Sequence, residues 1–192
     1  HHEGEDHDDH DHGHWDPHYW MDPRRAARMV ENIVQGLTAA DPDNGDAYRD
    51  NGEKAALLLS TWDAEARELL AREGTPGITG LITFHDGFQY FAQTYGLPLL
   101  AAIEEEAGSE ASAREINEIT ALVKEKGIPV IFTEVNGSDA TAKAIARETG
   151  CAVAQMSMCM DGPDGALSNY HDALRGNVAA IINGFAGEER VK

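Results

Sequence analysis

Apolar residues recur at helical spacing in the first part of the chain and gather into short continuous runs in the second. Between about residues 23 and 73 they return every three or four positions, which is typical of amphipathic helices. From residue 80 onward, runs typical of buried strands alternate with helical segments. These runs are Gly80 to Phe84, Leu97 to Ile103, Pro129 to Glu134 and Cys151 to Met158. The alternation predicts an α/β fold, with a parallel four-stranded sheet and helices on both of its faces.

Two helices are predicted before the first strand. Asp22 followed by Pro23 is typical of a capped helix start. The helix that follows carries one apolar face and ends near residue 41; the face comprises Ala26, Val30, Ile33, Val34 and Leu37. A second helix over about 46–73 would be ~40 Å long, enough to join two lobes. A helix interrupted near Gly52 is the alternative, because glycine costs about 1 kcal/mol inside a helix.

Capping residues also mark the helices between the later strands. Ser112 and Glu115 form a capping box, and Gly127 is a typical stop for the helix that follows. Ser138 is expected to cap the next helix, which ends at Gly150, and residues 169–185 are expected to form the last helix.

Charge narrows the range of partners. The 192 residues include 15 Lys plus Arg against 34 Asp plus Glu, a formal net charge of −19. Nucleic acid and anionic membranes are therefore poor partners, and cations are better ones. The sequence holds no run of ~18 apolar residues and does not begin like a signal peptide, so we expect a soluble, processed or truncated chain.

Residues 1–14 are rich in histidine and acidic residues and contain no aliphatic residue. Such a segment cannot bury a core, so a mobile loop is predicted. Its histidines alternate with carboxylates, which suits weak, interchanging metal sites better than one rigid site. They are His1, His2, His7, His10, His12 and His14.

Three candidate ligands or acid/base groups follow predicted strands. His85 comes after the first strand, Glu134 ends the third, and Asp161 follows the fourth. The carboxyl ends of parallel strands meet at one edge of a sheet, so these side chains are expected to converge. His18 lies just before the first capped helix. Imidazole and carboxylate are natural ligands of Zn²⁺, so His18, His85 and Asp161 would supply three of about four ligands.

Three ordered segments resemble motifs of periplasmic zinc-binding proteins of ABC importers. Residues 16–23 read DPHYWMDP, which resembles the family's DPHxWLDP motif. Residues 85–97 read HDGFQYFAQTYGL, which resembles HDAFGYFAxxYGL. Residues 160–178 read MDGPDGALSNYHDALRGNV, which resembles an LDPLG or TDSLS segment followed by a tyrosine helix.

The resemblance implies two α/β lobes joined by a rigid helix, with zinc held between them. Its domain division would be a His/Asp-rich loop (1–15), the end of an N-terminal lobe (16–45), a linking helix (46–74) and a C-terminal metal-binding lobe (75–192). The N-terminal lobe would be largely missing from this chain, together with a histidine ligand that it provides.

The resemblance also implies site residues and partners. The ligands carried over by motif are His18, His85 and Asp161; manganese-type relatives have glutamate at the position of His85, and a second imidazole suits zinc. Glu134 either orients a ligand histidine through a hydrogen bond or is simply a strand-end carboxylate. The implied protein is a monomer that captures Zn²⁺ in the periplasm, or outside the cell on a membrane anchor. Its implied partners are an ABC permease and a periplasmic zinc chaperone.

Two other functions compete with zinc delivery. A zinc hydrolase would use an open zinc position with Glu134 as base, but the sequence holds no HExxH pair, so we expect no enzyme. A surface adhesin or zinc buffer on the same fold is the third possibility.

Sulfur-containing residues and the last histidine are expected to be structural. Cys151 and Cys159 would lie ~26 Å apart on one strand, too far for a disulfide, so two thiols are expected. Met156, Met158 and Met160 suggest a copper(I) site only weakly, since methionines in a strand usually fill the core. His171 is expected on the surface of the last helix.

Overall fold

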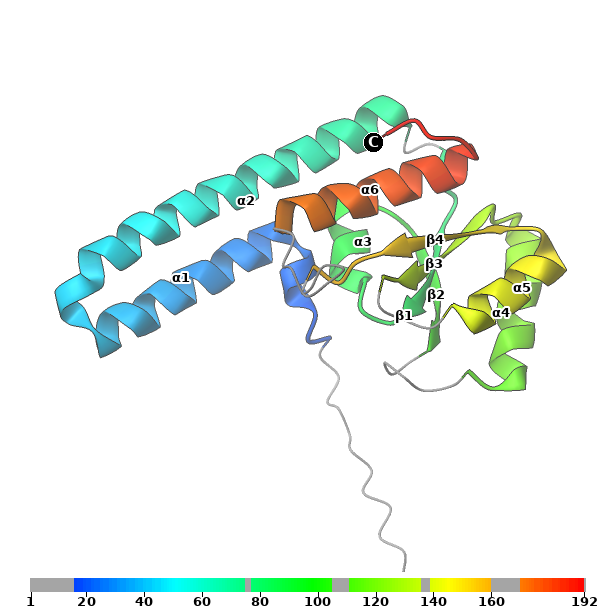
Figure 1. The fold of residues 1–192 in the computed structure, drawn as a ribbon, viewed down its shortest axis with the longest axis horizontal. Coiled ribbons are helices and arrows are strands. Elements are labelled where there is room, and N and C mark those ends of the chain that lie inside the picture. The colour runs from blue at the N-terminus through cyan, green and yellow to red at the C-terminus, as the bar shows by residue number, and fades with distance from the viewer. Residues whose placement is uncertain (1–15, 75–76, 105–110, 136–138, 160–169, 192) are drawn as a thin grey trace, which may run out of the picture.

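A computed structural model describes residues 16–74, 77–104, 111–135, 139–159 and 170–191 (Figure 1). Asp161, the histidines of residues 1–14, Ser138 and Met160 lie outside the described residues. The described part is an α/β fold in which a pair of helices leads into a parallel four-stranded sheet.

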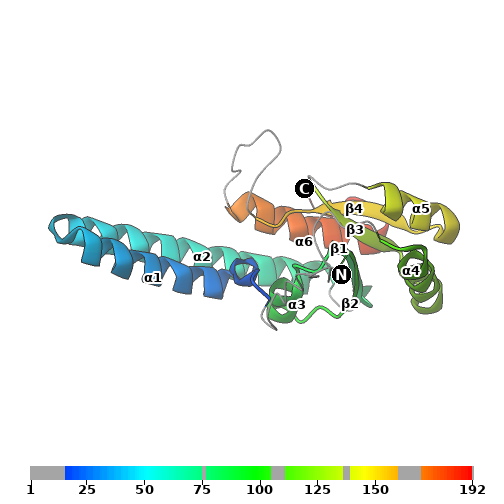
Figure 2. The same cartoon turned by 90° about the horizontal axis from the view of Figure 1, so that it is seen from below.

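The first two long helices, α1 (Pro23–Ala40) and α2 (Gly45–Glu73), pack along each other and extend away from the sheet (Figures 1 and 2). The Asp22 side chain caps α1 by accepting a hydrogen bond from the Arg24 backbone amide at 2.9 Å, as predicted. A one-turn helix, η1 (Tyr19–Met21), precedes α1, and a second, η2 (Pro42–Asn44), joins α1 to α2.

Helix α2 runs unbroken through Gly52, so the interrupted alternative is wrong. A Cβ atom at Gly52 would lie 2.4 Å from Val34 Cγ2, which means that the glycine lets α1 approach closely. The packing gained there offsets the low helix propensity of glycine.

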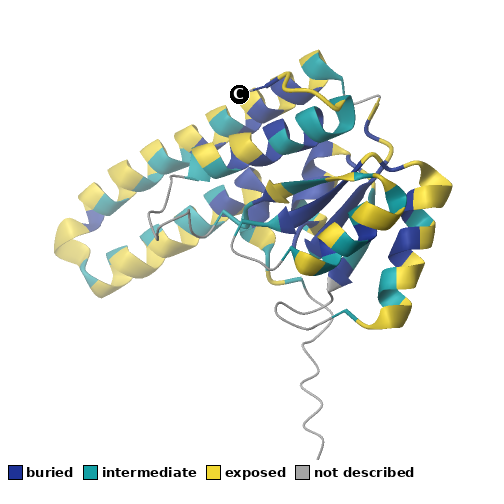
Figure 3. Cartoon of the chain, turned by 45° about the vertical axis from the view of Figure 1, so that its right-hand side comes forward, coloured by how far each residue is buried: buried dark blue, intermediate teal, exposed yellow. Residues whose placement is uncertain are grey.

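The apolar face predicted for α1 is only partly buried. Ala26 is buried, whereas Ile33 and Leu37 are exposed, as are Leu57 and Leu58 on α2 (Figure 3). Burial is concentrated where the two helices meet the sheet and decreases along the part of the pair that extends from it.

The sheet has the order β2-β1-β3-β4, and every pairing is parallel. Its strands are β1 (Leu81–His85), β2 (Leu99–Glu104), β3 (Val130–Glu134) and β4 (Ala152–Met156). The intervening and following helices are α3 (Gln89–Tyr95), α4 (Ala113–Lys126), α5 (Ala140–Thr149) and α6 (Tyr170–Ala186). The strands and helices thus alternate as predicted.

Helices cover both faces of the sheet, and each face has its own core. On one face, α2, α3 and α6 contribute to a cluster that includes Phe88, Phe91 and Leu174. On the other face, α4 and α5 contribute to a cluster that includes Val123 and Ile145. The predicted two-sided covering is confirmed.

Strand β4 ends two residues earlier than the apolar run predicts. The Asn177 side chain on α6 accepts a hydrogen bond from the Ser157 amide at 2.7 Å and donates one to the Ser157 carbonyl at 2.8 Å. Because these backbone groups bond to a side chain, the segment leaves the sheet after Met156.

The two cysteines form no disulfide, as expected, and two methionines of the same segment pack in the core. Cys151 and Cys159 are free thiols, and burial raises the pKa of the Cys159 thiol to about 12. Met156 is fully buried in the core, and Met158 packs against it.

No helix in the described ranges is long and apolar enough to span a membrane.

Two glycines of α6 offer a test of the packing between α6 and the sheet. A Cβ at Gly184 would lie 2.9 Å from both Cγ atoms of Val130, whereas a Cβ at Gly176 would meet nothing within 4 Å. We expect Gly184→Ala to lower the free energy of unfolding by about 1–3 kcal/mol through overpacking. Gly176→Ala should raise it by about 0.5–1 kcal/mol. Urea unfolding of both variants checks this; equal effects would contradict the close contact between α6 and β3.

Candidate metal centre

Two histidines far apart in the sequence meet at the carboxyl edge of the sheet. His85 is the last residue of β1, and His18 lies directly before η1. Their Nε2 atoms are 3.1 Å apart, and their rings meet edge to face with centroids 4.9 Å apart. The structure therefore brings together two of the three residues predicted as zinc ligands.

Asp16 fixes the orientation of His18. Its Oδ1 atom accepts hydrogen bonds from the His18 backbone amide at 2.9 Å and from His18 Nδ1 at 2.7 Å. With the ring proton on Nδ1, the lone pair of His18 is on Nε2, the atom that faces His85. A carboxylate that holds a histidine in this way also makes the imidazole a stronger metal ligand.

The turn that carries His18 is attached to two other parts of the fold. Trp20 Nε1 donates to the Met158 carbonyl at 2.8 Å, and the Tyr170 hydroxyl donates to the Trp20 carbonyl at 2.7 Å. Met21, at the end of η1, is buried in the core. Burial raises the pKa of Tyr170, which keeps its hydroxyl protonated as a donor. His18 is thus presented by a turn anchored to the segment after β4 and to α6.

Glu134 lies on β3, next to β1 in the sheet, but forms no hydrogen bond with either histidine. In the part of the chain that the structure describes, Glu134 Oε1 and His85 Nδ1 are each buried without a hydrogen-bond partner. A role for Glu134 in orienting a ligand stays a prediction.

The described residues contain no cluster of three His, Cys, Asp or Glu side chains suited to a metal. The third predicted ligand, Asp161, lies outside the described residues, as do the histidines of residues 1–14. The contribution of Asp16 was not predicted from the sequence. A signal for it was present, because a carboxylate two residues before a histidine can accept from both the amide and the ring of that histidine.

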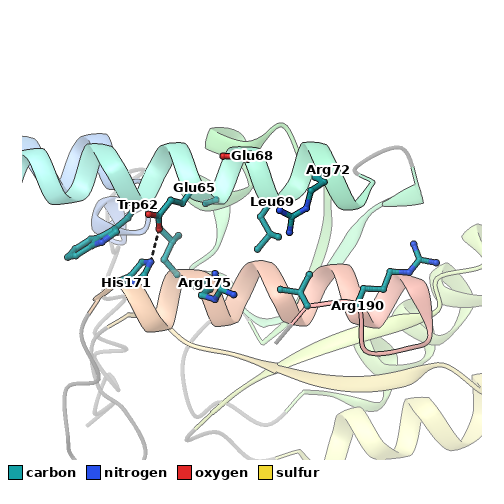
Figure 4. A pocket seen from close by; sticks show the side chains of 11 residues that line it. Trp62, Glu65, Glu68, Leu69, Arg72, His171, Arg175 and Arg190 are labelled. Carbon is teal, nitrogen blue, oxygen red and sulfur yellow. Dashed lines mark hydrogen bonds and ion pairs between the residues drawn. The ribbon is translucent and has the colours of Figure 1, made fainter.

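His171 lies away from this pair, in a hollow of about 320 Å³ between α2 and α6 (Figure 4). Its ring stacks on Trp62 with centroids 5.2 Å apart, and its Nε2 is 2.9 Å from Glu65 Oε2. The hollow is lined by neither His18 nor His85. His171 therefore joins two helices near the surface, in agreement with its predicted position.

Comparison with known proteins identifies the family. The model of the family described as "Zinc-uptake complex component A periplasmic" matches residues 1–184. This chain belongs to that family. It is a family of solute-binding proteins and not of enzymes, so the hydrolase alternative is set aside.

The names of individual relatives specify different metals. The chain is 29% identical to the iron-binding protein YfeA of Yersinia pestis over 171 residues, which cover 88% of this chain and 55% of YfeA. It is 33% identical to the zinc-binding lipoprotein AdcA of Streptococcus pneumoniae over 152 residues, which cover 76% of this chain and 30% of AdcA. The chain thus spans about half or less of the length of these curated relatives.

A solved structure supports the same assignment. The laminin-binding protein Lmb of Streptococcus agalactiae, described as bifunctional with adhesin and metal-transporting activity, matches with a TM-score of 0.78 and 29% identity. The match covers 89% of this chain and 65% of that one.

Proposed function

We propose that this chain captures Zn²⁺ outside the cytoplasmic membrane, with His18, His85 and Asp161 as ligands, and delivers the ion to an ABC permease. The observation that carries the proposal is the 3.1 Å separation of the two Nε2 atoms. Two imidazole nitrogens bound to one tetrahedral zinc at about 2.0–2.1 Å lie about 3.3–3.4 Å apart. A zinc ion would therefore need only a small adjustment of this pair.

Ligand chemistry favours zinc among the metals that relatives bind. Two imidazoles form a softer ligand set than carboxylates and suit zinc better than manganese. The hydrogen bond from Nδ1 to Asp16 holds the His18 ring with its Nε2 available for metal. The net charge of −19 attracts any divalent cation, so the selection has to come from the ligands.

The proposal extends to location and partners. The family description and the lipoprotein relative support a periplasmic or extracellular position, the latter with a membrane anchor. A permease is the expected receiving partner, and a zinc chaperone is a further one. In the domain division that we propose, α2 is the linking helix and residues 75–192 form the metal-binding lobe. The acidic, His-rich residues 1–14 would hold zinc weakly near His18.

A zinc titration tests the proposal. We expect calorimetry of this chain to show one tight zinc equivalent, bound more tightly than manganese, together with several weaker equivalents. A chain lacking residues 1–14 should retain the tight equivalent and lose most of the weak ones, because a segment without apolar residues cannot hold a preorganised site. The weak binding should fade in mildly acid solution as the imidazoles become protonated.

Two results would contradict these expectations. Tighter binding of manganese than zinc would overturn the choice of metal. Loss of the tight equivalent with residues 1–14 would mean that this segment supplies a ligand of the main site.

A further inference from the structure

The two histidines are oriented by different means. His18 has a hydrogen bond from Nδ1 to Asp16 at 2.7 Å. His85 Nδ1 is buried and has no hydrogen-bond partner among the described residues. A metal-binding histidine is normally held by a hydrogen bond from its second nitrogen, so the His85 ring needs another restraint.

The Met158 side chain, which lies in the space beside Gly87, is such a restraint on the His85 ring. A Cβ atom at Gly87 would lie 2.4 Å from Met158 Cε, 3.1 Å from Met158 Sδ and 2.8 Å from His85 Cδ2. The end of the Met158 side chain thus occupies the place of a side chain at residue 87, next to the imidazole. Cδ2 is bonded to Nε2, so the ring edge nearest Gly87 is the one that carries the nitrogen facing His18.

The backbone of Met158 is held in place. Trp20 Nε1 donates to its carbonyl at 2.8 Å, and Asn177, only 1% exposed, forms two hydrogen bonds with the preceding Ser157 backbone. Methionine side chains are flexible, but one that starts from a fixed backbone and packs against the core has fewer positions available. The same Trp20 belongs to the turn that presents His18, so one residue connects both sides of the histidine pair.

We propose that Met158 is a positioning residue for the metal site, filling the space that Gly87 leaves open and holding the His85 imidazole toward His18. The inference rests on the proposed function, because His85 is taken there as a ligand. Packing is the means: the thioether acts through its shape and does not bind the ion.

A double-mutant cycle of zinc affinity tests this role. Met158→Ala removes the restraint, and Gly87→Ala forces the thioether and the ring edge apart. Each should weaken zinc binding about 10-fold or more, as loss of other groups that orient ligands does. In the double variant the new methyl group no longer meets the thioether, although its close approach to His85 Cδ2 remains, so the loss of affinity should be smaller than the two single losses combined. Met158→Leu, which keeps the bulk and removes the sulfur, should bind zinc almost as the unaltered chain does.

Controls separate this inference from the proposed function. Gly176→Ala should leave the affinity unchanged, and His85→Ala should lose it. If His85→Ala binds zinc normally, the proposed function fails. If His85→Ala loses binding while Gly87→Ala and Met158→Ala do not, only the positioning role is overturned. A loss for Met158→Leu as large as that for His85→Ala would show that sulfur is a ligand and would also overturn it.

Nuclear magnetic resonance of the metal-free chain provides a readout independent of zinc. With ¹³C-methyl-labelled methionine, a nuclear Overhauser contact is expected between the Met158 methyl group and His85 Hδ2, and it should disappear in Gly87→Ala. Absence of this contact in the unaltered chain would overturn the inference whatever the zinc affinity.

Discussion

Replacing His85 with alanine is expected to weaken zinc binding by more than about 100-fold and to leave the fold intact. Groups that only orient a ligand contribute about 10- to 100-fold to metal affinity, so loss of a ligand should exceed that range. His85 is at the end of β1 and only partly buried, with its Nε2 directed at His18 and not into the core. His18→Ala should have a similar effect. Competition with a zinc chelator measures the affinity, and circular dichroism checks the fold.

His171→Ala is the matched control, because it removes an imidazole from the hollow between α2 and α6. Its zinc affinity should equal that of the unaltered chain. An affinity for His85→Ala within a factor of about three of the control would refute its role as a ligand, since even groups that only orient a ligand contribute about 10- to 100-fold.

Most of the fold follows from local signals. The capping box of Ser112 and Glu115 forms as predicted, and in it the Ser112 amide donates a hydrogen bond to the Glu115 carboxylate. The hydrogen bonds with Ser112 hold the pKa of Glu115 below its usual range. Gly127 and Gly150 end their helices at positive φ, a conformation that glycine adopts without strain. These elements were predictable because each signal and its effect lie within a few residues.

The features that the sequence did not predict depend on contacts between distant residues. The early end of β4 results from Asn177, 20 residues later, and the close approach of α1 to α2 at Gly52 involves Val34 on the neighbouring helix. Neither contact has a signature in the local pattern of apolar positions. The spacing of apolar residues is a poor guide to structure where a side chain replaces a backbone hydrogen-bond partner, or where two helices approach closely.

The candidate site, too, was predictable from the sequence only in part. That His85 lies at the carboxyl edge follows from strand order, and its pairing with His18 was expected from the motifs. The packing of Met158 beside Gly87 was not, because it needs the path of the chain after β4. A sequence reveals which side chains can bind a metal more readily than it reveals what holds them in position.

Asp16→Ala is expected to lower zinc affinity by about 10- to 100-fold, although Asp16 is not proposed to touch the ion. The substitution removes both hydrogen bonds that Oδ1 accepts from His18, so the ring can rotate and can carry its proton on Nε2. Asp16→Asn should lose less, because an amide oxygen still accepts from both groups while the negative charge that strengthens the imidazole is gone. Asp43→Ala, an exposed carboxylate in η2, is the control for the change in net charge.

Two measurements together decide the role of Asp16. Chelator competition should rank the affinities as unaltered chain, Asp16→Asn and Asp16→Ala in decreasing order, with Asp43→Ala equal to the unaltered chain. Imidazole ¹⁵N spectra of the metal-free chain should show the His18 proton on Nδ1 and a mixture of tautomers in Asp16→Ala. An unchanged tautomer with unchanged affinity would mean that the turn alone orients His18; lower affinity with an unchanged tautomer would assign the effect of Asp16 to its charge.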